Sequence, residues 1–276
     1  MGAAMTYDAA TKTVILFSGI RGDGTSPLTD TWTWDGCRWT KQTPTTSPPG
    51  RSFGGLAFDQ KSGKVVLFGG GSANSDPARN DTWTWDGSTW QQAHPSTSPP
   101  PMAGVLMDHD RTNQVLVLWG KTLQGDQPTT WTWDGMNWIE RHPAAEPTLR
   151  FGAALAFGAR SGVLLFGGQP GEVGGLNDTW VWDGDNWRQL HPATSPTGGA
   201  ASMVHEDAHH DVLMIEHDGT WIWNGSTWAH RVSSPPFEWY RSIAYDAAHA
   251  RVLLFGGKSP QTNLATNEFW TSDGTT

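Results

Sequence analysis

The chain has 276 residues, including 33 Gly, 18 Pro and 18 Trp, and carries a formal net charge of -9. Hydrophobic residues make up 37% of the chain, which argues against disorder, while the frequent Gly and Pro argue against a helical bundle. The acidic balance, without any Lys/Arg cluster, argues against nucleic-acid binding, and no apolar run is long enough to span a membrane.

The start of the chain and its single cysteine bear on the cellular compartment and on the possibility of disulfide bonds. Residues 1–20 contain no basic segment followed by a long apolar stretch, so the numbered chain predicts no signal peptide. We therefore expect a cytoplasmic protein as numbered, or a secreted one if an upstream signal was removed. Because Cys37 cannot form an internal disulfide, a hydrophobic core must stabilise the fold.

Three kinds of segment recur along the chain in a fixed order. The first copy has a run of small and apolar residues at 2–8, a β-branched run at 14–19 and the block DTWTWDGCRW at 30–39. The β-branched run returns at 65–70, 115–120, 163–168, 212–217 and 252–257. The Trp block returns at 81–90, 129–138, 178–187, 219–228 and, shortened, 267–274. Its first Trp recurs every 41–51 residues, at Trp32, Trp83, Trp131, Trp180, Trp221 and Trp270.

Each repeat is typical of four short antiparallel strands, which we call A to D. Strand A leads through a polar turn into strand B, strand C is the Trp-x-Trp segment, and an Asp-Gly turn leads into strand D. Six such units predict an all-β, six-bladed β-propeller, because identical sheets bury both faces by radial stacking. The expected blades of this single domain (1–276) are approximately 2–46, 51–97, 101–145, 150–194, 198–234 and 239–276. Since the sequence stops just after Asp273 and Gly274, the last blade should have three strands and the ring should close by packing.

The repeats resemble the kelch repeat over essentially the whole chain. The resemblance rests on the glycine pairs at 69–70, 167–168 and 256–257, the aromatic-x-aromatic-Asp block and the Trp that follows it. Conventional kelch units usually have Tyr in strand C, so this chain would be a Trp-rich, bacterial-type member. The resemblance implies that the D-A and B-C loops share the usual binding face. Each repeated Trp is expected to pack between neighbouring blades.

Departures from the repeat mark positions where function can be added to the fold. The aligned residues near the start of strand A are Ala3, Gly54, Ala103, Ala153, Ala201 and Arg241. Four residues later the aligned set is Tyr7, Phe58, Met107, Phe157, His205 and Tyr245. At the second glycine of strand B the set is Gly19, Gly70, Gly120, Gly168, His217 and Gly257, and Trp119 replaces the first glycine of the third repeat. The fifth repeat also has an unusually short B-C connection, 216–219.

The expected binding face combines acids, bases and aromatic rings around one funnel. We take His217, Glu238 and Tyr240 as candidates for acid/base catalysis, since His titrates near neutral pH and can pair with a carboxylate. Arg suits carboxylates and phosphates, and aromatic rings offer stacking surfaces. The ligand-binding candidates are Arg51, Trp119, Arg150, Glu216, Asp218, Trp239 and Arg241. In a plainer interpretation, Glu238 and Arg241 form a local ion pair and His217 is a solvated loop residue.

The sequence thus predicts a monomeric binding scaffold that recognises a small anionic or carbohydrate-like ligand, or a protein partner. The alternative is an enzyme, resembling a mutarotase, cyclase or lyase, that uses acid/base residues on a small anionic or sugar-like substrate. A third interpretation is a structural module of a larger surface protein. No cofactor or metal is expected. Although His205, Glu206, His209 and His210 are ligand types, the last three belong to an A-B turn on the opposite face.

Overall fold

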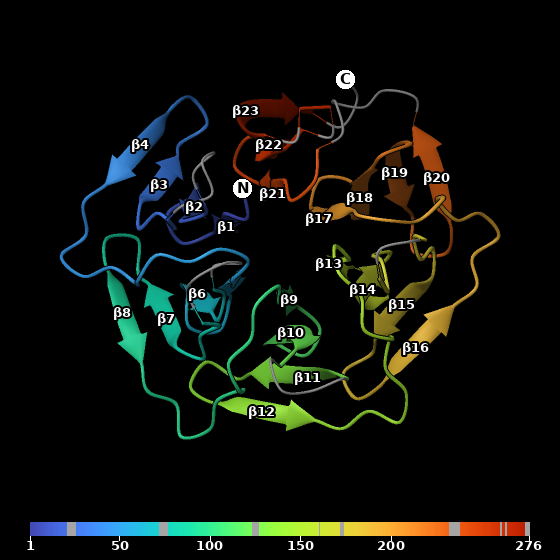
Figure 1. The fold of residues 1–276 in the computed structure, drawn as a ribbon, viewed down its shortest axis with the longest axis horizontal. Coiled ribbons are helices and arrows are strands. Elements are labelled where there is room, and N and C mark those ends of the chain that lie inside the picture. The colour runs from blue at the N-terminus through green and yellow to red at the C-terminus, as the bar shows by residue number, and fades with distance from the viewer. Residues whose placement is uncertain are drawn as a thin grey trace.

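The computed structural model describes residues 1–20, 26–71, 77–122, 127–159, 161–171, 174–231, 238–259, 261–262 and 264–273. Its strands form six antiparallel sheets in a ring around a central axis (Figure 1). Five sheets have four strands and the last has three, so the predicted six-bladed propeller is confirmed. Residues 232–234 of the predicted fifth blade and Gly274 of the last predicted turn lie outside the described residues. In the described part of the chain, no helix is long and apolar enough to cross a membrane.

Each blade runs outward from an inner strand beside the axis, in the predicted order A to D (Figure 1). The inner strands of blades 1 to 6 are β1 (Ala4–Asp8), β5 (Gly55–Asp59), β9 (Leu106–Asp110), β13 (Ala154–Gly158), β17 (Ser202–Glu206) and β21 (Ser242–Asp246). The second strands are β2 (Thr13–Phe17), β6 (Lys64–Phe68), β10 (Val115–Lys121), β14 (Gly162–Phe166), β18 (Asp211–Glu216) and β22 (Arg251–Lys258). The third strands are β3 (Thr31–Trp34), β7 (Thr82–Trp85), β11 (Pro128–Trp133), β15 (Thr179–Trp182), β19 (Gly219–Trp223) and β23 (Ala265–Ser272). The outer strands are β4 (Trp39–Gln42), β8 (Trp90–Ala93), β12 (Trp138–Arg141), β16 (Trp187–Leu190) and β20 (Trp228–Arg231).

Short polar turns connect the strands of each hairpin. At the end of β1, the Asp8 carboxylate accepts hydrogen bonds from the N–H groups of Ala10 and Thr11. An Asp at the same position closes the inner hairpins of blades 2, 3 and 6 in the same way. Side chains of this kind favour turns because they satisfy the N–H groups that the turn leaves unpaired.

The hydrophobic core is divided into six clusters, each joining two neighbouring blades. The outer-strand Trp residues fill these seams, as expected from the repeat. Trp138 of blade 3, for example, packs on Phe68 of blade 2 with ring centroids 5.0 Å apart and donates from Nε1 to Thr82 Oγ1 at 2.9 Å. Equivalent Trp-to-Thr hydrogen bonds join Trp90 to Thr31, Trp187 to Thr130 and Trp228 to Thr179. A buried indole thus satisfies its one donor while its ring removes a large apolar area from water.

The seam that closes the ring, between blades 6 and 1, is built differently. Strand β1 pairs with β2 of its own blade and packs beside β21, so the ring closes by packing, as predicted. At this seam Phe269 occupies the position of the seam Thr. The ring of Trp39 meets Phe269 at 5.6 Å and Phe255 at 6.2 Å between centroids. Among the described residues, Trp39 Nε1 has no hydrogen-bond partner, so ring contacts replace the Trp-to-Thr bond.

Candidate functional site

The six inner strands surround a central channel with a volume of about 1020 Å³. Small residues near the strand starts, such as Ala3, Gly54 and Ala153, help to line it. The volume is at the upper end of the range for small-molecule sites. We call the end where the inner strands begin the mouth, because the D-A and B-C loops surround it. The end with the A-B turns is the floor.

A left-handed backbone conformation recurs at the mouth, two residues before the inner strand. Gly2, Gly104 and Gly152 adopt φ angles of 65°, 68° and 68°, but Phe53 and Tyr240 adopt 56° and 59° at the equivalent position. The Phe53 N–H donates to the Gly2 carbonyl, and the Gly104 N–H donates to the Phe53 carbonyl, both at 2.9 Å. This conformation costs a bulky L-residue about 1–2 kcal/mol, so both Phe53 and Tyr240 are strained, and the links to blades 1 and 3 hold Phe53 in place.

The two strained residues place aromatic rings over the mouth. The rings of Phe53 and Tyr240 meet edge to face, with centroids 5.3 Å apart and planes at 75°. Tyr240 is 51% exposed and Phe151, on the same rim, is 65% exposed. All three line the channel. Backbone strain and exposed apolar rings both concentrate at binding sites, which makes the mouth the candidate site.

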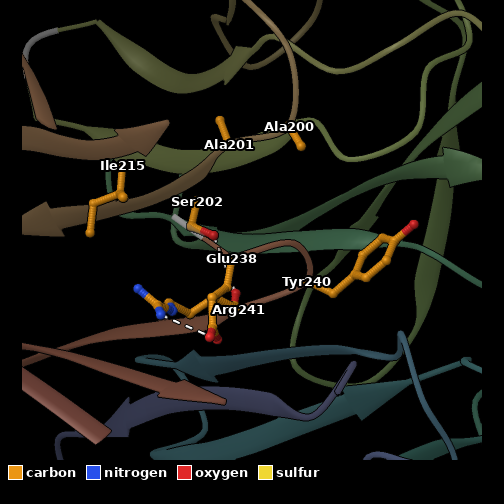
Figure 2. A pocket seen from close by; sticks show the side chains of 7 residues that line it. All are labelled: Ala200, Ala201, Ser202, Ile215, Glu238, Tyr240 and Arg241. Atoms are coloured by element: carbon orange, nitrogen blue, oxygen red, sulfur yellow. Dashed lines mark hydrogen bonds and ion pairs between the residues drawn. The ribbon is translucent and has the colours of Figure 1, made fainter. Parts of the chain in front are cut away.

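Polar groups of blade 6 line a small cavity together with Tyr240 (Figure 2). Arg241 Nη2 is 3.2 Å from Glu238 Oε2, and Arg241 Nε donates to the Gly256 carbonyl at 3.2 Å. Figure 2 shows Ser202 next to this pair, with Tyr240 projecting away from it. These residues line a cavity of about 20 Å³, which is enough for one water molecule. The structure therefore brings three predicted site residues, Glu238, Tyr240 and Arg241, to one place. Trp239 lies between them in sequence and is 38% exposed.

Arg51 and Arg150 form equivalent buried clamps within their own blades. Arg51 contacts both carboxylate oxygens of Asp81, at 2.7 and 2.8 Å, and donates to the Gly69 carbonyl at 2.9 Å. Arg150 makes the same contacts with Asp178 and the carbonyl of residue 167. Each Arg side chain is 1% exposed. Because these guanidinium groups are buried and satisfied by the protein, we assign them no ligand contact.

Blade 5 lacks this clamp and places two carboxyl groups close together instead. Asp218 accepts hydrogen bonds from Trp221 Nε1 at 2.9 Å and from Thr197 Oγ1 at 3.0 Å. Glu216 is 1% exposed, and its burial, with the nearby Asp218 charge, raises its pKa to about 8. His217 is exposed in the B-C connection. The predicted short length of this connection is confirmed, because β18 ends at Glu216 and β19 begins at Gly219. Within the described residues, the channel lining includes none of Glu216, His217 and Asp218.

The buried Glu216 should make the fold less stable as the pH rises. The ordinary pKa of this carboxyl is 4.5, so the unfolded chain ionises from about that pH, whereas the folded chain stays protonated to about pH 8. We expect a loss on the order of 3 kcal/mol in the free energy of unfolding between about pH 5 and pH 8. Urea unfolding across this range should show the slope in the parent chain and a flatter line in Glu216→Gln. Identical slopes in both chains would contradict the assignment.

Trp119 does not stand where the sequence alignment places it. It pairs with Leu106 in the register in which Phe68 pairs with Gly55, so it fills the Phe position of strand B and not the first glycine. It is 2% exposed and belongs to the core cluster between blades 3 and 4. Its prediction as a rim residue open to a ligand is therefore wrong, because a seam large enough for Phe also accepts an indole.

The inner strand of blade 3 is likewise shifted by two residues from the alignment. His109, and not Met107, occupies the position of Tyr7 and Phe58, because it pairs with Leu116 as they pair with Val14 and Val65. Val105, and not Ala103, stands just before the inner strand at the position aligned with Ala3 and Gly54. Lys121, and not Gly120, stands at the position of the second glycine of strand B. The Asp that caps the A-B turn in four of the blades could have fixed this register, because Asp110 follows His109 directly.

The channel floor holds a polar cluster that the sequence alignment missed. Arg111 of blade 3 forms an ion pair with Asp207 of blade 5, and its guanidinium carbon lies 5.5 Å from the ring centroid of Phe157 in blade 4. His205 Nε2 is 3.4 Å from Asp207 Oδ1. Burial opposes ionisation of Asp207, but His205 and Arg111 outweigh it and hold its pKa well below its usual range. Burial lowers the pKa of His109, whose ring nitrogens have no hydrogen-bond partner in the described part of the chain.

The residue types at the floor suggest a metal, but their arrangement does not. Within the described ranges, no group of three or more His, Cys, Asp or Glu side chains is arranged to hold a metal ion. Of the residues considered from the sequence, His209 Nδ1 lies 3.7 Å from Glu206 Oε2, in an A-B turn away from the mouth.

Comparison with known proteins supports the propeller fold. No protein-family model matches the sequence, and no curated protein matches it. Among solved structures, the chain is similar to one titled "Structure of YjhT", with a TM-score of 0.70 and 15% identity. The likeness covers 97% of this chain and 93% of that chain, so it extends over the whole ring.

Proposed function

We propose that the chain is a binding scaffold whose channel mouth takes a small anionic or carbohydrate-like ligand. The observation that carries the proposal is the pair of rings, Phe53 and Tyr240, held in strained backbone conformations over a ligand-sized channel. Glycine occupies the same position in three other blades, so the ring closure alone does not require an aromatic residue there. A function that uses the rings accounts for the strain.

The polar groups at the mouth favour a ligand with both hydroxyl and acidic groups. Lys258 lines the channel and supplies positive charge for a carboxylate, whereas the charge of Arg241 is buried and paired with Glu238. Glu238 lies beside Arg241 and can accept a hydrogen bond from a hydroxyl group. The apolar face of a sugar ring packs well against aromatic side chains, as Tyr240 and Phe53 would provide. A sugar acid combines these features, which makes D-glucuronate a suitable probe and D-glucose its uncharged counterpart.

Replacing Tyr240 by Gly should weaken ligand binding about tenfold without unfolding the protein. The change removes about 1–2 kcal/mol of left-handed strain, which offsets the lost ring contact and the added chain entropy. We therefore expect the free energy of unfolding to stay within about 1 kcal/mol of the parent value. Saturation-transfer NMR should show D-glucuronate binding more tightly than D-glucose to the parent chain, and about tenfold weaker binding to Tyr240→Gly.

Met136 provides a control position on the outside of blade 3. Met136 is 72% exposed in the outer turn between β11 and β12, so Met136→Ala removes an exposed apolar side chain away from the channel. This variant should bind the sugars as the parent does. If neither sugar saturates the parent chain at millimolar concentration, or if Met136→Ala weakens binding as much as Tyr240→Gly, the mouth is not the site.

The alternative is acid/base catalysis at the same mouth. The observation in its favour is that Glu238 and Tyr240 line one small cavity next to the channel. His217, the third catalytic candidate, is outside the described channel lining, so the catalytic set would be Glu238 with Tyr240. The NMR sample separates the two functions. Accelerated exchange between the anomers of D-glucuronate, lost in Glu238→Gln, would indicate a mutarotase, whereas binding without exchange supports the scaffold.

We infer that the blades are of the kelch type. Support comes from the glycine pairs, which adopt positive φ angles in three blades, including 62° and 88° at Gly69 and Gly70. A side chain at Gly70 would come within 2.8–2.9 Å of backbone atoms of Ser52 and Gly54, so this position requires glycine. The first carbonyl of the pair accepts an Arg hydrogen bond in blades 2, 4 and 6.

A further inference from the structure

A collar of large apolar side chains surrounds the channel between its mouth and its floor. The second residue of every inner strand contributes one of them, and all six line the channel: Met5, Leu56, Met107, Leu155, Met203 and Ile243. Each of the six pairs with a Leu or Met of the second strand in its own blade. The collar positions are therefore equivalent in the repeat and lie at one level of the channel.

Charge is confined to the two ends of the channel. Among the described lining residues, the Lys, Arg, Asp and Glu side chains are Arg241 and Lys258 at the mouth and Asp108, Arg111 and Asp207 toward the floor. The collar lies between these two groups and contributes only aliphatic and thioether side chains. A ligand that reaches below the mouth thus meets an apolar surface before it meets the charges of the floor.

The channel is larger than a sugar acid at its mouth requires. Its volume of about 1020 Å³ reaches the upper end of the range of about 300–1,000 Å³ for drug-sized ligands. A sugar held at the rings of Phe53 and Tyr240 leaves the collar open to a further part of the same molecule. Three collar residues are Met, whose unbranched, polarisable side chain adapts to apolar groups of different shape.

We propose that the ligand is a glycoside of a sugar acid, whose apolar aglycone extends from the mouth into the collar. This inference rests on the proposed function, because Tyr240 and Phe53 hold the sugar and Lys258 attracts its carboxylate. The collar adds affinity by removing the aglycone from water. An unbranched alkyl chain suits a narrow passage between six inner strands, and the charged floor limits how deeply it gains by entering.

The test compares methyl and octyl β-D-glucuronide, which share the sugar acid and differ in the apolar chain. Calorimetric titration below the micelle-forming concentration should show the octyl compound binding at least about tenfold more tightly, since each fully buried CH₂ group contributes about fourfold. With Met methyl groups labelled for NMR, the octyl compound should shift the signals of Met5, Met107 and Met203, and the methyl compound should not. Met136, which is 72% exposed outside the channel, should respond to neither.

A matched pair of substitutions tests the collar itself. Ile243→Asn places an amide in the collar and should remove most of the octyl advantage while leaving the affinity for the methyl compound unchanged. Ile139 is 42% exposed on the outer strand β12, so Ile139→Asn makes the same exchange outside the channel and should preserve the advantage. The ratio of the two affinities is the measured quantity, so a general loss of affinity does not imitate the result. If Ile243→Asn does not fold, the Met shifts in the parent chain still decide.

Three outcomes would overturn the proposal, and they separate it from the function proposed for the mouth. Equal affinities for the methyl and octyl compounds, or octyl-induced shifts that spare the collar Met residues, would exclude the aglycone and leave sugar binding at the mouth intact. Octyl β-D-glucoside binding as tightly as octyl β-D-glucuronide would show that the sugar acid contributes nothing. If neither glucuronide saturates the protein at millimolar concentration, the proposed function fails together with this inference.

Discussion

Replacing Arg51 by Ala is expected to lower the free energy of unfolding by about 3–5 kcal/mol. The guanidinium is 1% exposed and holds both oxygens of Asp81, so its removal leaves a carboxylate in a partly buried site without its counter-charge. The Gly69 carbonyl loses its donor at the same time. Burial favours the neutral form of Asp81, but Arg51 outweighs it and lowers the pKa of that carboxyl. Urea unfolding at neutral pH measures the loss.

The chain contains a matched control for this substitution. In blade 1, Asp30 stands at the position of Asp81, but its partner is Lys41, whose side chain is 50% exposed. Exposed pairs contribute about 0–1 kcal/mol, so Lys41→Ala should barely change the midpoint. A double substitution, Arg51→Ala with Asp81→Ala, should recover part of the loss, because no unpaired charge remains. A loss below about 1 kcal/mol for Arg51→Ala would show that the clamp is not structural and would reopen Arg51 as a ligand contact.

Replacing Trp138 by Ala is expected to cost a similar amount, about 3–5 kcal/mol. Trp138 is 1% exposed, and its ring packs against Phe68 across the seam and against Trp133 in its own blade. The substitution empties a rigid seam and leaves Thr82 without its indole donor. Thermal and urea unfolding, followed by Trp fluorescence, give the change in stability.

The closing seam supplies the comparison for Trp138. Trp39 occupies the same repeat position, but it is only partly buried and makes no Nε1 hydrogen bond among the described residues. Trp39→Ala should therefore lower the free energy of unfolding by about 1–2 kcal/mol, which is the free energy gained by removing a half-buried ring from water. Equal losses at the two positions would mean that the ring contacts of Trp39 with Phe269 and Phe255 stabilise the closing seam as much as the buried, hydrogen-bonded Trp138 stabilises its own seam.

The fold was predictable because its spacing is carried by residues with strong geometric requirements. An Asp-Gly or Asn-Gly turn and the Trp that follows it recur in five complete blocks, so the blades could be counted, and three strands were expected for blade 6, as the described residues show. The register inside blade 3 was not predictable in this way. Trp119 fills a Phe position in the seam, and an alignment that treats it as a replaced glycine shifts His109 out of place.

The candidate site was predictable in its location and only partly in its members. Glu238, Tyr240 and Arg241 were expected on one face and share one small cavity. The side chains of Arg51 and Arg150 are buried within their own blades. Sequence alone does not reveal this, because an Arg before a strand can point into the protein or into solvent. Phe53 was missed because its significance lies in its φ angle. The glycines at 2, 104 and 152 were the available signal, since a bulky residue in a column of glycines implies strain.

The hydrogen bonds that link Gly2, Phe53 and Gly104 around the mouth have a kinetic consequence. They tie the backbone under the Phe53 ring to blades 1 and 3, so the ring's position is fixed before any ligand arrives. A ligand that meets such a preorganised surface pays little for ordering side chains or loops. Its association should therefore be governed by diffusion into the mouth, and differences in affinity between related ligands should appear mainly in how slowly they leave.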